Sequence, residues 1–447
     1  MTAGYLDTLA EFAATTDIEK VPDGVVDATT RIVLDTLGVI VAAAPAPPLR
    51  RFAREVTERE GTASLLGHDA RSTPELAALV NGTAANWVEL DEGNHTTLGH
   101  VGIHVIPAVL ALAESRGCSG RELLTAVLAG YEVGARVARM GRLRWHIHPH
   151  GTWGAMAGAV ACARLLGLPA PAIREALGIA SSLALVTSRR TIAEGASVKY
   201  LWTGVASQHA LQAVRFAHCG FTAEADGPAS LFCSISDAPI AGREVVGDLG
   251  LRWEVEHAYF KTYACCRYAA PSVEAMLTAR ADGLDPDVVT AIDVDTFGLA
   301  AHLDTLQAHH ELSARFSIPY CVAAAAVLGS CGPEAFRDAT RADARVLALG
   351  ERVRVHEVPA YTAEFPSATP ARVTVRLRDG SVRQAEVRHA HGDPQRPLDA
   401  AGLRRKFHAL TAGVLGAGAE DAARAILDVA STPDVRTITA RLRGTAS

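Results

Sequence analysis

The stretch Asp23-Gly-Val-Val-Asp-Ala-Thr-Thr-Arg-Ile-Val-Leu-Asp-Thr-Leu37 decides the fold class. Its apolar side chains recur at three- and four-residue steps, which is the spacing of one face of an α-helix. The pair Pro22-Asp23 in front of it is a helix-entry signal. Strand patterns are weak in the first 260 residues, whereas helical patterns also cover 74–90, 107–115, 120–140, 153–166 and 197–219. We therefore predict a mainly α protein with a large all-helical domain.

The pattern changes near residue 262. Alternating apolar residues predict strands at 289–296, 352–358, 371–378 and 381–388, with helices at 270–280 and 317–328 between them. The Asp379-Gly380 pair between the last two strands is a hairpin signal. From Asp399 onward the helical pattern returns. We predict a helical domain of residues 1–262 plus 398–447, with a smaller α+β domain of residues 263–397 inserted into it.

Composition limits the class of function. The chain has 447 residues, of which 49% are hydrophobic and 21% charged, so it can bury a large core and is neither disordered nor fibrous. A net charge of -6 without a basic excess argues against a nucleic-acid partner. The first 20 residues lack the basic and apolar parts of a signal peptide, and apolar runs such as 37–44 are too short to span a bilayer. We expect a cytoplasmic protein with no membrane partner.

The eight cysteines are scattered without a CxxC pair. The adjacent Cys265 and Cys266 suit neither an ordinary disulfide nor a zinc knuckle. We expect reduced thiols, and we interpret this pair as packing residues.

Lysine is scarce. The 43 basic residues include only four lysines, which are Lys20, Lys199, Lys261 and Lys406. An ammonium group can lose its proton when it is desolvated, whereas a guanidinium practically cannot. The surviving lysines are therefore candidates for special roles. Lys20 and Lys406 belong to no motif, and we expect them at the surface.

Residues 89–104 form the first polar segment. The carboxylate of Asp91 and its acidic neighbours can hold or polarise the imidazoles of His95 and His100, which gives an acid/base group. The alternative is a capped loop with solvated acids. A metal site is also conceivable because His100 and His104 are four residues apart. However, an HExxH motif needs a glutamate between its histidines, and Val101-Gly102-Ile103 supplies none. We therefore expect no metal.

The second polar segment, residues 145–154, leads into a helix of small residues. Free amides at a helix start attract anions, and His148, His150 and Thr152 add donors that suit a carboxylate. A polar helix entry in which a histidine merely caps is the alternative.

Two further segments carry lysine. Ser197 can cap a helix, which places Lys199 in the first helical turn, where a cation opposes the helix dipole. This placement indicates carboxylate binding or proton transfer, with an incidental surface lysine as the alternative. Lys261 and Arg267 lie near the predicted domain junction, where ligand sites are common. Both can contact an anion, and Arg267 can do so with two parallel hydrogen bonds.

Taken in order, these segments resemble the motifs of the MmgE/PrpD family. The family's D-x-D-D-T-H and H-P-G correspond to 89–94 and 100–102, its H-P-T-G-T-x-G to 148–154, and its K-x-Y-P-C-C-R to 261–267. Its lysine before an alanine-rich helix is matched by Lys199, and its F-S-L-P-Y by 316–320. The motif histidine falls on Asn94, one place before His95. After Arg267 the family's two histidines are replaced. The resemblance covers almost the whole chain.

The resemblance implies a helical domain with an α+β lid, an active site between the two, a homodimer, and no metal or organic cofactor. It carries six catalytic candidates over to this chain: Asp91, His100, His148, Lys199, Lys261 and Tyr320. We add four predicted substrate-binding residues: His95, His150, Thr152 and Arg267.

The implied chemistry is formation of a carbanion or enolate next to a carboxylate of a small di- or tricarboxylate. In this hypothesis Lys199, Lys261 and Arg267 bind the substrate carboxylates and stabilise the developing charge. His100, oriented by Asp91, is the leading acid/base group.

Tyr320 or His148 moves the second proton. We predict a lyase, either a dehydratase/hydratase or a decarboxylase. An epimerase or isomerase of an amino- or imino-dicarboxylate is the alternative. A metal-dependent hydrolase using His95, His100 and His104, and a non-catalytic binding protein, are further alternatives.

Overall fold

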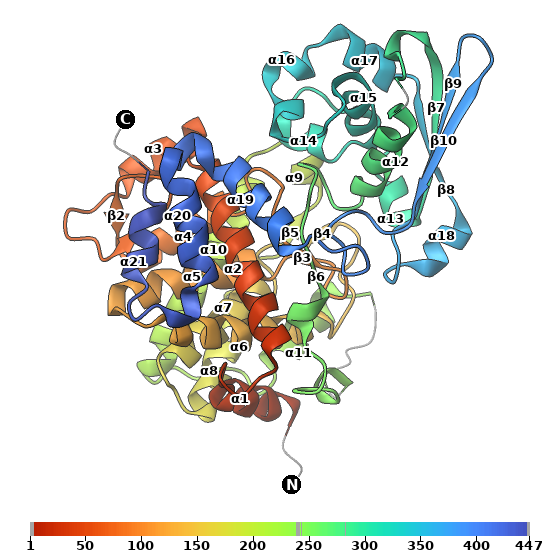
Figure 1. Cartoon of the computed structure of the whole chain (residues 1–447). Coiled ribbons are helices and arrows are strands. Elements are labelled where there is room, and N and C mark those ends of the chain that lie inside the picture. The colour runs from red at the N-terminus through yellow and green to blue at the C-terminus, as the bar shows by residue number, and fades with distance from the viewer. Residues whose placement is uncertain (1–3, 238–241, 243, 282, 445–447) are drawn as a thin grey trace. The chain divides into compact units, whose positions relative to one another are not determined.

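The computed structural model describes residues 4–237, 242, 244–281 and 283–444, so residues 1–3 of the N-terminal segment lie outside the described part. The chain folds into two compact units (Figure 1). Unit 1 comprises Met1–Arg189, Tyr200–Ala258 and Asp399–Ser447, and unit 2 comprises Arg190–Lys199 and Tyr259–Leu398. Helices dominate the chain, which confirms the prediction of a mainly α protein.

Unit 1 is built almost entirely of helices. Its elements are α1 (Tyr5–Thr15), α2 (Asp23–Ala43), α3 (Pro47–Glu55), α4 (Pro74–Ala84), α5 (Gly102–Arg116), α6 (Gly120–Ala138), α7 (Gly154–Leu165), α8 (Ala170–Ser182), α10 (Val198–His218), α11 (Gly227–Ile235), α19 (Ala400–Leu415), α20 (Ala419–Leu427) and α21 (Arg436–Thr439). The first two residues of α10 belong to unit 2.

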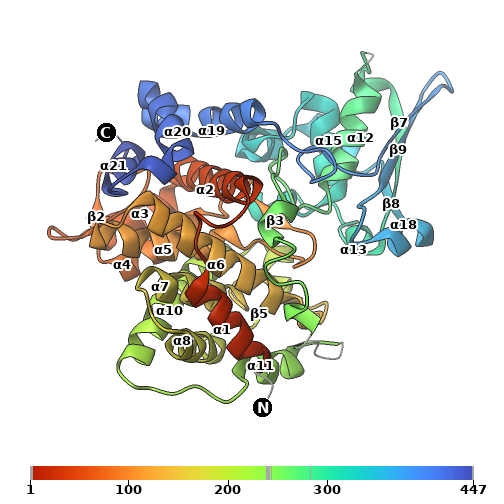
Figure 2. The ribbon, with the colours of Figure 1, turned by 60° about the horizontal axis from the view of Figure 1, so that its bottom comes forward.

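Helix α2 lies at the centre of unit 1. It contains the stretch from which the helical class was predicted, and every residue from Ile32 to Val41 is buried. Figure 2 shows α2 with α19 and α20 on one side and α5 and α6 on the other, and all four helices contact it. A helix that is buried all round needs apolar residues on every face. The single charge within that buried run, Asp35, therefore requires a partner.

Helices α5, α6 and α7 pack closely because their facing residues are small. A Cβ placed on Gly134 of α6 would lie only 2.3 Å from the Cβ of Ala157 on α7. This approach explains the Ala- and Gly-rich sequence of 153–166.

Two predicted helix boundaries in unit 1 were wrong. Helix α5 begins at Gly102, five residues before the predicted start, and Pro107 lies inside it. Proline removes one backbone hydrogen bond, but all residues from Gly102 to Ala111 are buried, and this burial outweighs the loss. Helix α4 ends at Ala84 instead of residue 90, and residues 85–101 form a buried loop that carries the first polar segment.

Unit 2 combines a four-stranded sheet with helices. The strands are β7 (Val289–Thr296), β8 (Val353–Glu357), β9 (Ala371–Leu377) and β10 (Val382–Val387), in the order β10-β9-β7-β8. Strands β7 and β8 are parallel, and the other two pairs are antiparallel. The predicted hairpin is confirmed: Gly380 adopts φ +86° in the turn between β9 and β10, a conformation that favours glycine.

The helices of unit 2 include α12 (Ala270–Arg280), which packs on β9 and β10, and α15 (Ile318–Leu328), which packs on α12 and β8 (Figure 1). Shorter helices complete the unit: α9 (Arg190–Ala193), α13 (Gly298–Ala301), α14 (Glu311–Arg315), α16 (Asp338–Arg341), α17 (Ala344–Gly350) and α18 (Pro359–Glu364).

Among the described residues, no single helix has both the length and the apolar character needed to cross a bilayer. The pair α2 and α3, which meet at a bend of 94°, passes that test only when the two helices are counted together.

Candidate active site

The loop that precedes α5 in unit 1 has a strained backbone. Among the described residues, the two non-glycine residues with positive φ are Glu89 (52°) and Leu98 (51°), and they bracket most of the first polar segment. Such conformations cost free energy and persist only where the surrounding structure enforces them. Asp91 and Glu92, between them, are fully buried. The fold thus holds two buried carboxyl groups in a fixed loop.

His100, at the end of this loop, is oriented by two oxygen atoms. Its Nδ1 lies 2.8 Å from Oδ2 of Asp91 and 2.5 Å from the backbone oxygen of Glu92. Both oxygens are acceptors, so Nδ1 carries a proton and the lone pair of the neutral ring is on Nε2. The side chain keeps 13% of its surface exposed. The predicted pairing of Asp91 with His100 is therefore present, and Nε2 has the character of a base.

His104, one turn further along, is held at both ring nitrogens. Nδ1 donates to the backbone oxygen of His100 (2.7 Å), and Nε2 accepts from the backbone N–H of Gly151 (3.1 Å). Both contacts fix a neutral ring with no lone pair left for a metal ion. The ring is also packed tightly, since a Cβ on Gly154 would lie 2.1 Å from its Cδ2. The metal-site alternative through His100 and His104 therefore has no support in this geometry.

His148 has the opposite hydrogen-bonding pattern from His100. It lies on β4 (Ile147–His148), which pairs with β5 (Thr187–Ser188). Its Nδ1 accepts the backbone N–H of His150 at 3.2 Å, so the proton of the neutral ring is on Nε2. The Thr187 hydroxyl donates to the backbone oxygens of His148 and His150 and fixes this turn. His148 thus presents an N–H donor where His100 presents a lone pair.

His150 lies between these histidines. The distances between ring centres are 4.4 Å to His148, 5.2 Å to His100 and 5.7 Å to His104, each in an edge-to-face arrangement. The four histidines, which we call the histidine cluster, therefore form one group at the N-terminal ends of α5 and α7. The Thr152 hydroxyl, expected to bind substrate, donates instead to the backbone oxygen of Leu185 (3.0 Å).

His95 lies half-buried in the loop after β3 (Gly93–Asn94). The adjacent Asn94 stands at the position of the family's motif histidine. Both the nitrogen and the oxygen of its side-chain amide form hydrogen bonds within the protein. Its amide donates to the backbone oxygen of Glu254, and its side-chain oxygen accepts from Thr96.

Glu92 supports the loop as a protonated group. Its carboxyl group accepts the N–H of Gly102 at the start of α5 (2.5 Å) and the Tyr131 hydroxyl (3.2 Å). Burial, with the nearby charges of Asp91 and Asp35, raises the pKa of Glu92 to about 8, against the lowering effects of the hydrogen bonds from Gly102 and Tyr131. Glu92 therefore stays neutral at pH 7 while it caps the helix.

Lys406 was expected at the surface, and this expectation was wrong. The side chain is only 11% exposed, and its Nζ lies 2.5 Å from Oδ1 of Asp35 and 2.6 Å from the backbone oxygen of Leu90. Lys406 thus ties α19 to α2 and to the residue before Asp91. Burial raises the pKa of Asp35, and the Lys406 ammonium opposes that rise. The signals in the sequence were the rarity of lysine and a lone aspartate within an apolar helix.

The other predicted residues lie in unit 2. Lys199 is fully buried, with its Nζ 5.6 Å from the ring centre of Phe316, so it is no incidental surface lysine. Lys261 is buried as well. Both keep an amine in a desolvated place, which suits the binding of an anion.

Arg267 and Tyr320 each interact with another residue of unit 2. The Arg267 guanidinium forms a buried ion pair with Asp393 and lies 4.6 Å from the ring centre of Tyr259. The Tyr320 hydroxyl donates to the backbone oxygen of Ala335 at 2.6 Å, and burial raises its pKa. The Ala335 contact satisfies the Tyr320 hydroxyl, whereas Nε and Nη1 of Arg267 are buried with no hydrogen-bond partner among the described residues.

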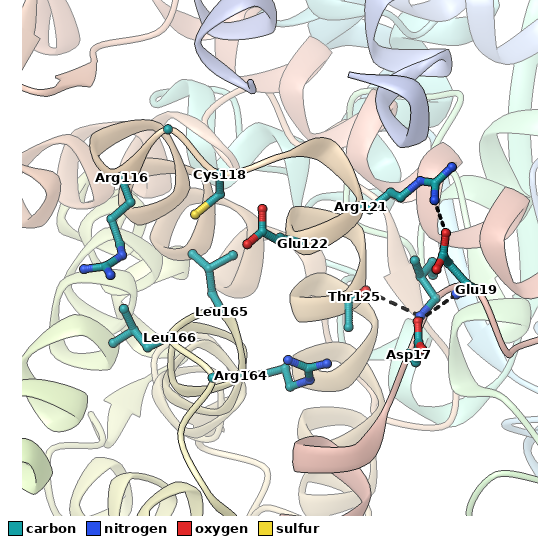
Figure 3. A pocket seen from close by; sticks show the side chains of 13 residues that line it. Asp17, Glu19, Arg116, Cys118, Arg121, Glu122, Thr125, Arg164, Leu165 and Leu166 are labelled. Carbon is teal, nitrogen blue, oxygen red and sulfur yellow. Dashed lines mark hydrogen bonds and ion pairs between the residues drawn. The ribbon is translucent and has the colours of Figure 1, made fainter. Parts of the chain in front are cut away.

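A surface pocket of about 650 Å³ lies at the other end of α5 and α7 from the histidine cluster (Figure 3). Two of its charged groups are engaged: Arg121 pairs with Glu19, and Arg164 donates to the backbone oxygen of Thr16 (2.8 Å). None of the predicted site residues lines it. We assign it no role in catalysis.

Two domain families match most of the chain. The N-terminal domain of MmgE/PrpD proteins matches residues 7–229, and their C-terminal domain matches residues 263–432. The chain belongs to the MmgE/PrpD family, which confirms the resemblance.

Several curated relatives are named cis-aconitate decarboxylase. The protein from Aspergillus terreus is 26% identical over 296 residues, which is 61% of this chain and 60% of that protein. The mouse (Mus musculus) protein is 24% identical over 419 residues, covering 88% of this chain and 83% of its own, and the human protein is 25% identical over 407 residues, covering 87% and 83%. The matched region thus spans less than two thirds of the Aspergillus protein.

Proposed function

We propose that this chain is a lyase that acts on a small di- or tricarboxylate and needs no metal or organic cofactor. Decarboxylation of a tricarboxylate such as cis-aconitate is the reaction that we favour. The names of the relatives support this choice of substrate.

One observation carries the proposal. His100 and His148 belong to one cluster, and their hydrogen bonds set them in opposite tautomers. His100, whose Nδ1 faces Asp91 and the backbone oxygen of Glu92, carries the lone pair of its neutral ring on Nε2. His148, with Nδ1 occupied by a backbone N–H, can donate a proton only from Nε2. The donor of this pair can deliver a proton to carbon after carbon dioxide leaves, and the base can remove a proton from carbon in the epimerase alternative.

In the proposed reaction the bond between the substrate carbon and one carboxylate breaks, and carbon dioxide leaves. The electron pair of that bond is delocalised over the neighbouring double bond and the carboxylate attached to it. The Nε2–H of His148 then delivers a proton to carbon, and solvent returns one to the imidazole. The net change is loss of carbon dioxide and uptake of one proton.

Lys199 and Lys261 are the cations that we assign to the substrate carboxylates. Charge-assisted hydrogen bonds from ammonium groups in desolvated places stabilise charge that develops in a transition state. Tyr320 is left out of this assignment because its hydroxyl already donates to Ala335, and Arg267 is left out because its charge is already paired with Asp393. Thr152 is left out for the same reason.

An epimerase or isomerase is the second candidate. The same opposed tautomers favour it, since His100 can remove a proton from one face of a carbon while His148 returns one to the other. No bond to a leaving group breaks in that case.

A substrate screen in heavy water distinguishes the candidates. The purified protein is incubated with cis-aconitate and a panel of other di- and tricarboxylates, and the products are followed by proton NMR and carbon dioxide release. Carbon dioxide release with one deuterium in the product supports the decarboxylase. Loss or gain of water supports a dehydratase, and deuterium incorporation without net conversion supports the epimerase. No exchange with any acid contradicts the proposal.

The homodimer implied by the family resemblance stays a prediction. Multi-angle light scattering checks it, because a dimer has twice the 47.0 kDa mass of the chain.

A further inference from the structure

Three buried cysteines of unit 2 meet although they are far apart in the sequence. Cys265 precedes α12, Cys321 lies on α15, and Cys331 follows α15. Their sulfur atoms all lie within 4.8 Å of one another, and all three side chains are buried. We call them the thiol cluster. Cys265 and Cys266 were interpreted as packing residues, and the proposed reaction uses neither.

Backbone hydrogen bonds fix the segments that carry these thiols. The N–H of Ala264 donates to the backbone oxygen of Cys331 (2.8 Å), and the N–H of Cys266 donates to that of Arg315 (2.8 Å). The Cys321 thiol faces the backbone oxygen of Ala314 at 3.4 Å. The three sulfurs are thus brought together by the fold and do not depend on flexible side chains alone.

The electrostatic surroundings favour sulfur in its anionic form. Hydrogen bonds from the thiols of Cys265 and Cys321 lower the pKa of Cys331, and the Arg315 guanidinium lowers it further, against burial and the charge of Glu334. Hydrogen bonding to Cys331 and burial raise the pKa of Cys265, and the charge of Lys261 opposes that rise. Burial raises the pKa of Cys321. The thiol cluster therefore combines three buried sulfurs within 4.8 Å of one another with the adjacent positive charges of Arg315 and Lys261.

We propose that the thiol cluster is a binding site for a thiophilic d10 metal ion, with Cu(I) as its occupant. Soft thiolates select Cu(I) and zinc among the metals of proteins. Structural zinc sites take four ligands, whereas the described residues place only three His, Cys, Asp or Glu ligand atoms together here. Three sulfurs about 2.3 Å from a shared ion lie roughly 4 Å apart, so a contraction of under about 1 Å completes a trigonal site.

Metal binding exchanges thiol protons for the metal ion. Cu(I) displaces the protons that the three sulfurs carry, forms three metal–sulfur bonds and releases those protons to solvent. The resulting anionic centre lies near the positive charges of Arg315 and Lys261. No electron is transferred. The site is independent of the proposed lyase reaction, so its existence can be tested without a substrate.

Metal binding is measured on the reduced full-length protein under anaerobic conditions, by titration against a chromophoric Cu(I) chelator. The exposed Cys219 and Cys233 are first replaced by serine, so that surface thiols do not compete. We expect this background protein to bind one tight equivalent of Cu(I). Adding Cys331→Ser or Cys321→Ser lowers the affinity by at least about 100-fold, whereas adding Cys162→Ser, a buried cysteine of unit 1, leaves it unchanged.

X-ray absorption of the copper-loaded background protein gives a second readout that needs no cluster variant. Three sulfur neighbours at about 2.3 Å are expected. Equal Cu(I) affinity with and without Cys331, a copper shell of fewer than three sulfurs, or tight zinc binding without Cu(I) binding overturns the proposal. A variant that fails to fold, as judged by circular dichroism, is replaced by Cys331→Ala.

Discussion

In the histidine cluster of unit 1, a hydrogen bond sets the Nδ1 of His100 as a donor and the Nδ1 of His148 as an acceptor, so the two rings are opposite tautomers. In unit 2, Arg267 and Tyr320 use their polar groups on Asp393 and Ala335. Both regions are buried and rich in polar groups, and family resemblance marks residues in each. The contrast teaches that burial and motif position do not by themselves identify a reacting group. The hydrogen bonds that a side chain already makes show which of its atoms remain for chemistry.

The largest expected effect is on proton transfer in unit 1. His148→Gln and His100→Gln should each lower kcat/KM by about 10²–10⁴-fold, because each removes a positioned acid or base. His146→Gln, which changes an exposed histidine two residues from His148, is the matched control and should retain activity. Steady-state kinetics with the substrate found by the screen measures these effects. Similar activity of all three variants would contradict the proton-transfer roles of His100 and His148.

The next effect concerns the buried ion pair of Lys406. Lys406→Met leaves the carboxyl group of Asp35 buried without its cation and should lower the free energy of unfolding by about 3 kcal/mol or more. Lys20→Met is the control, since Lys20 is 81% exposed and pairs only with Asp17, and it should change stability by under about 1 kcal/mol. Urea denaturation measures both. Equal stability of the two variants contradicts the structural role of Lys406.

A smaller effect separates the two kinds of cation in unit 2. Lys261→Met should lower kcat/KM by about 10–100-fold, the value of one or two charge-assisted hydrogen bonds. Arg267→Met should mainly lower the thermal midpoint, because it leaves Asp393 buried without its partner. If Arg267→Met raises KM and leaves stability unchanged, Arg267 binds substrate and the contrast drawn above fails.

A last effect, spread over several pH units, is a change in the pH dependence of stability. The pKa of Glu92 rises from 4.5 to about 8 on folding, so the folded state binds more protons than the unfolded state between these values. The contribution of Glu92 is therefore present at low pH and is lost as pH rises toward 8, by up to about 1.4 kcal/mol per pH unit.

Glu92→Gln should flatten this slope while its amide oxygen continues to accept from Gly102. Denaturation curves at pH 5, 6, 7 and 8, compared with those of the exposed-surface variant Glu11→Gln, give the measurement. An unchanged slope shows that Glu92 is ionised in the folded protein.

Local sequence patterns predicted the regular elements well. Strand β7 spans the residues predicted from alternation, and α12 spans those predicted from helical spacing. The start of α5 was missed because Pro107 is a local signal for a helix boundary, whereas burial of the preceding turn is a tertiary effect.

In the candidate site, too, contacts within one segment were predictable from the sequence, whereas contacts between distant segments were not. Asp91 and His100 are nine residues apart within one polar segment, so their contact was predictable. Lys406 and Asp35 are separated by 371 residues, and the three thiols come from separate segments. No periodicity or short motif encodes such pairs. The contacts of Arg267 with Asp393 and of Tyr320 with Ala335 could not be predicted for the same reason.

The opposite tautomers of His100 and His148 are the central claim, and nitrogen-15 NMR of histidine-labelled protein tests them directly. Long-range proton–nitrogen correlations distinguish Nδ1–H from Nε2–H, and spectra of His100→Gln and His148→Gln assign the two rings. The account predicts a neutral Nδ1–H ring for His100 and a neutral Nε2–H ring for His148 above the pKa of each. Finding the same tautomer at both positions would contradict it.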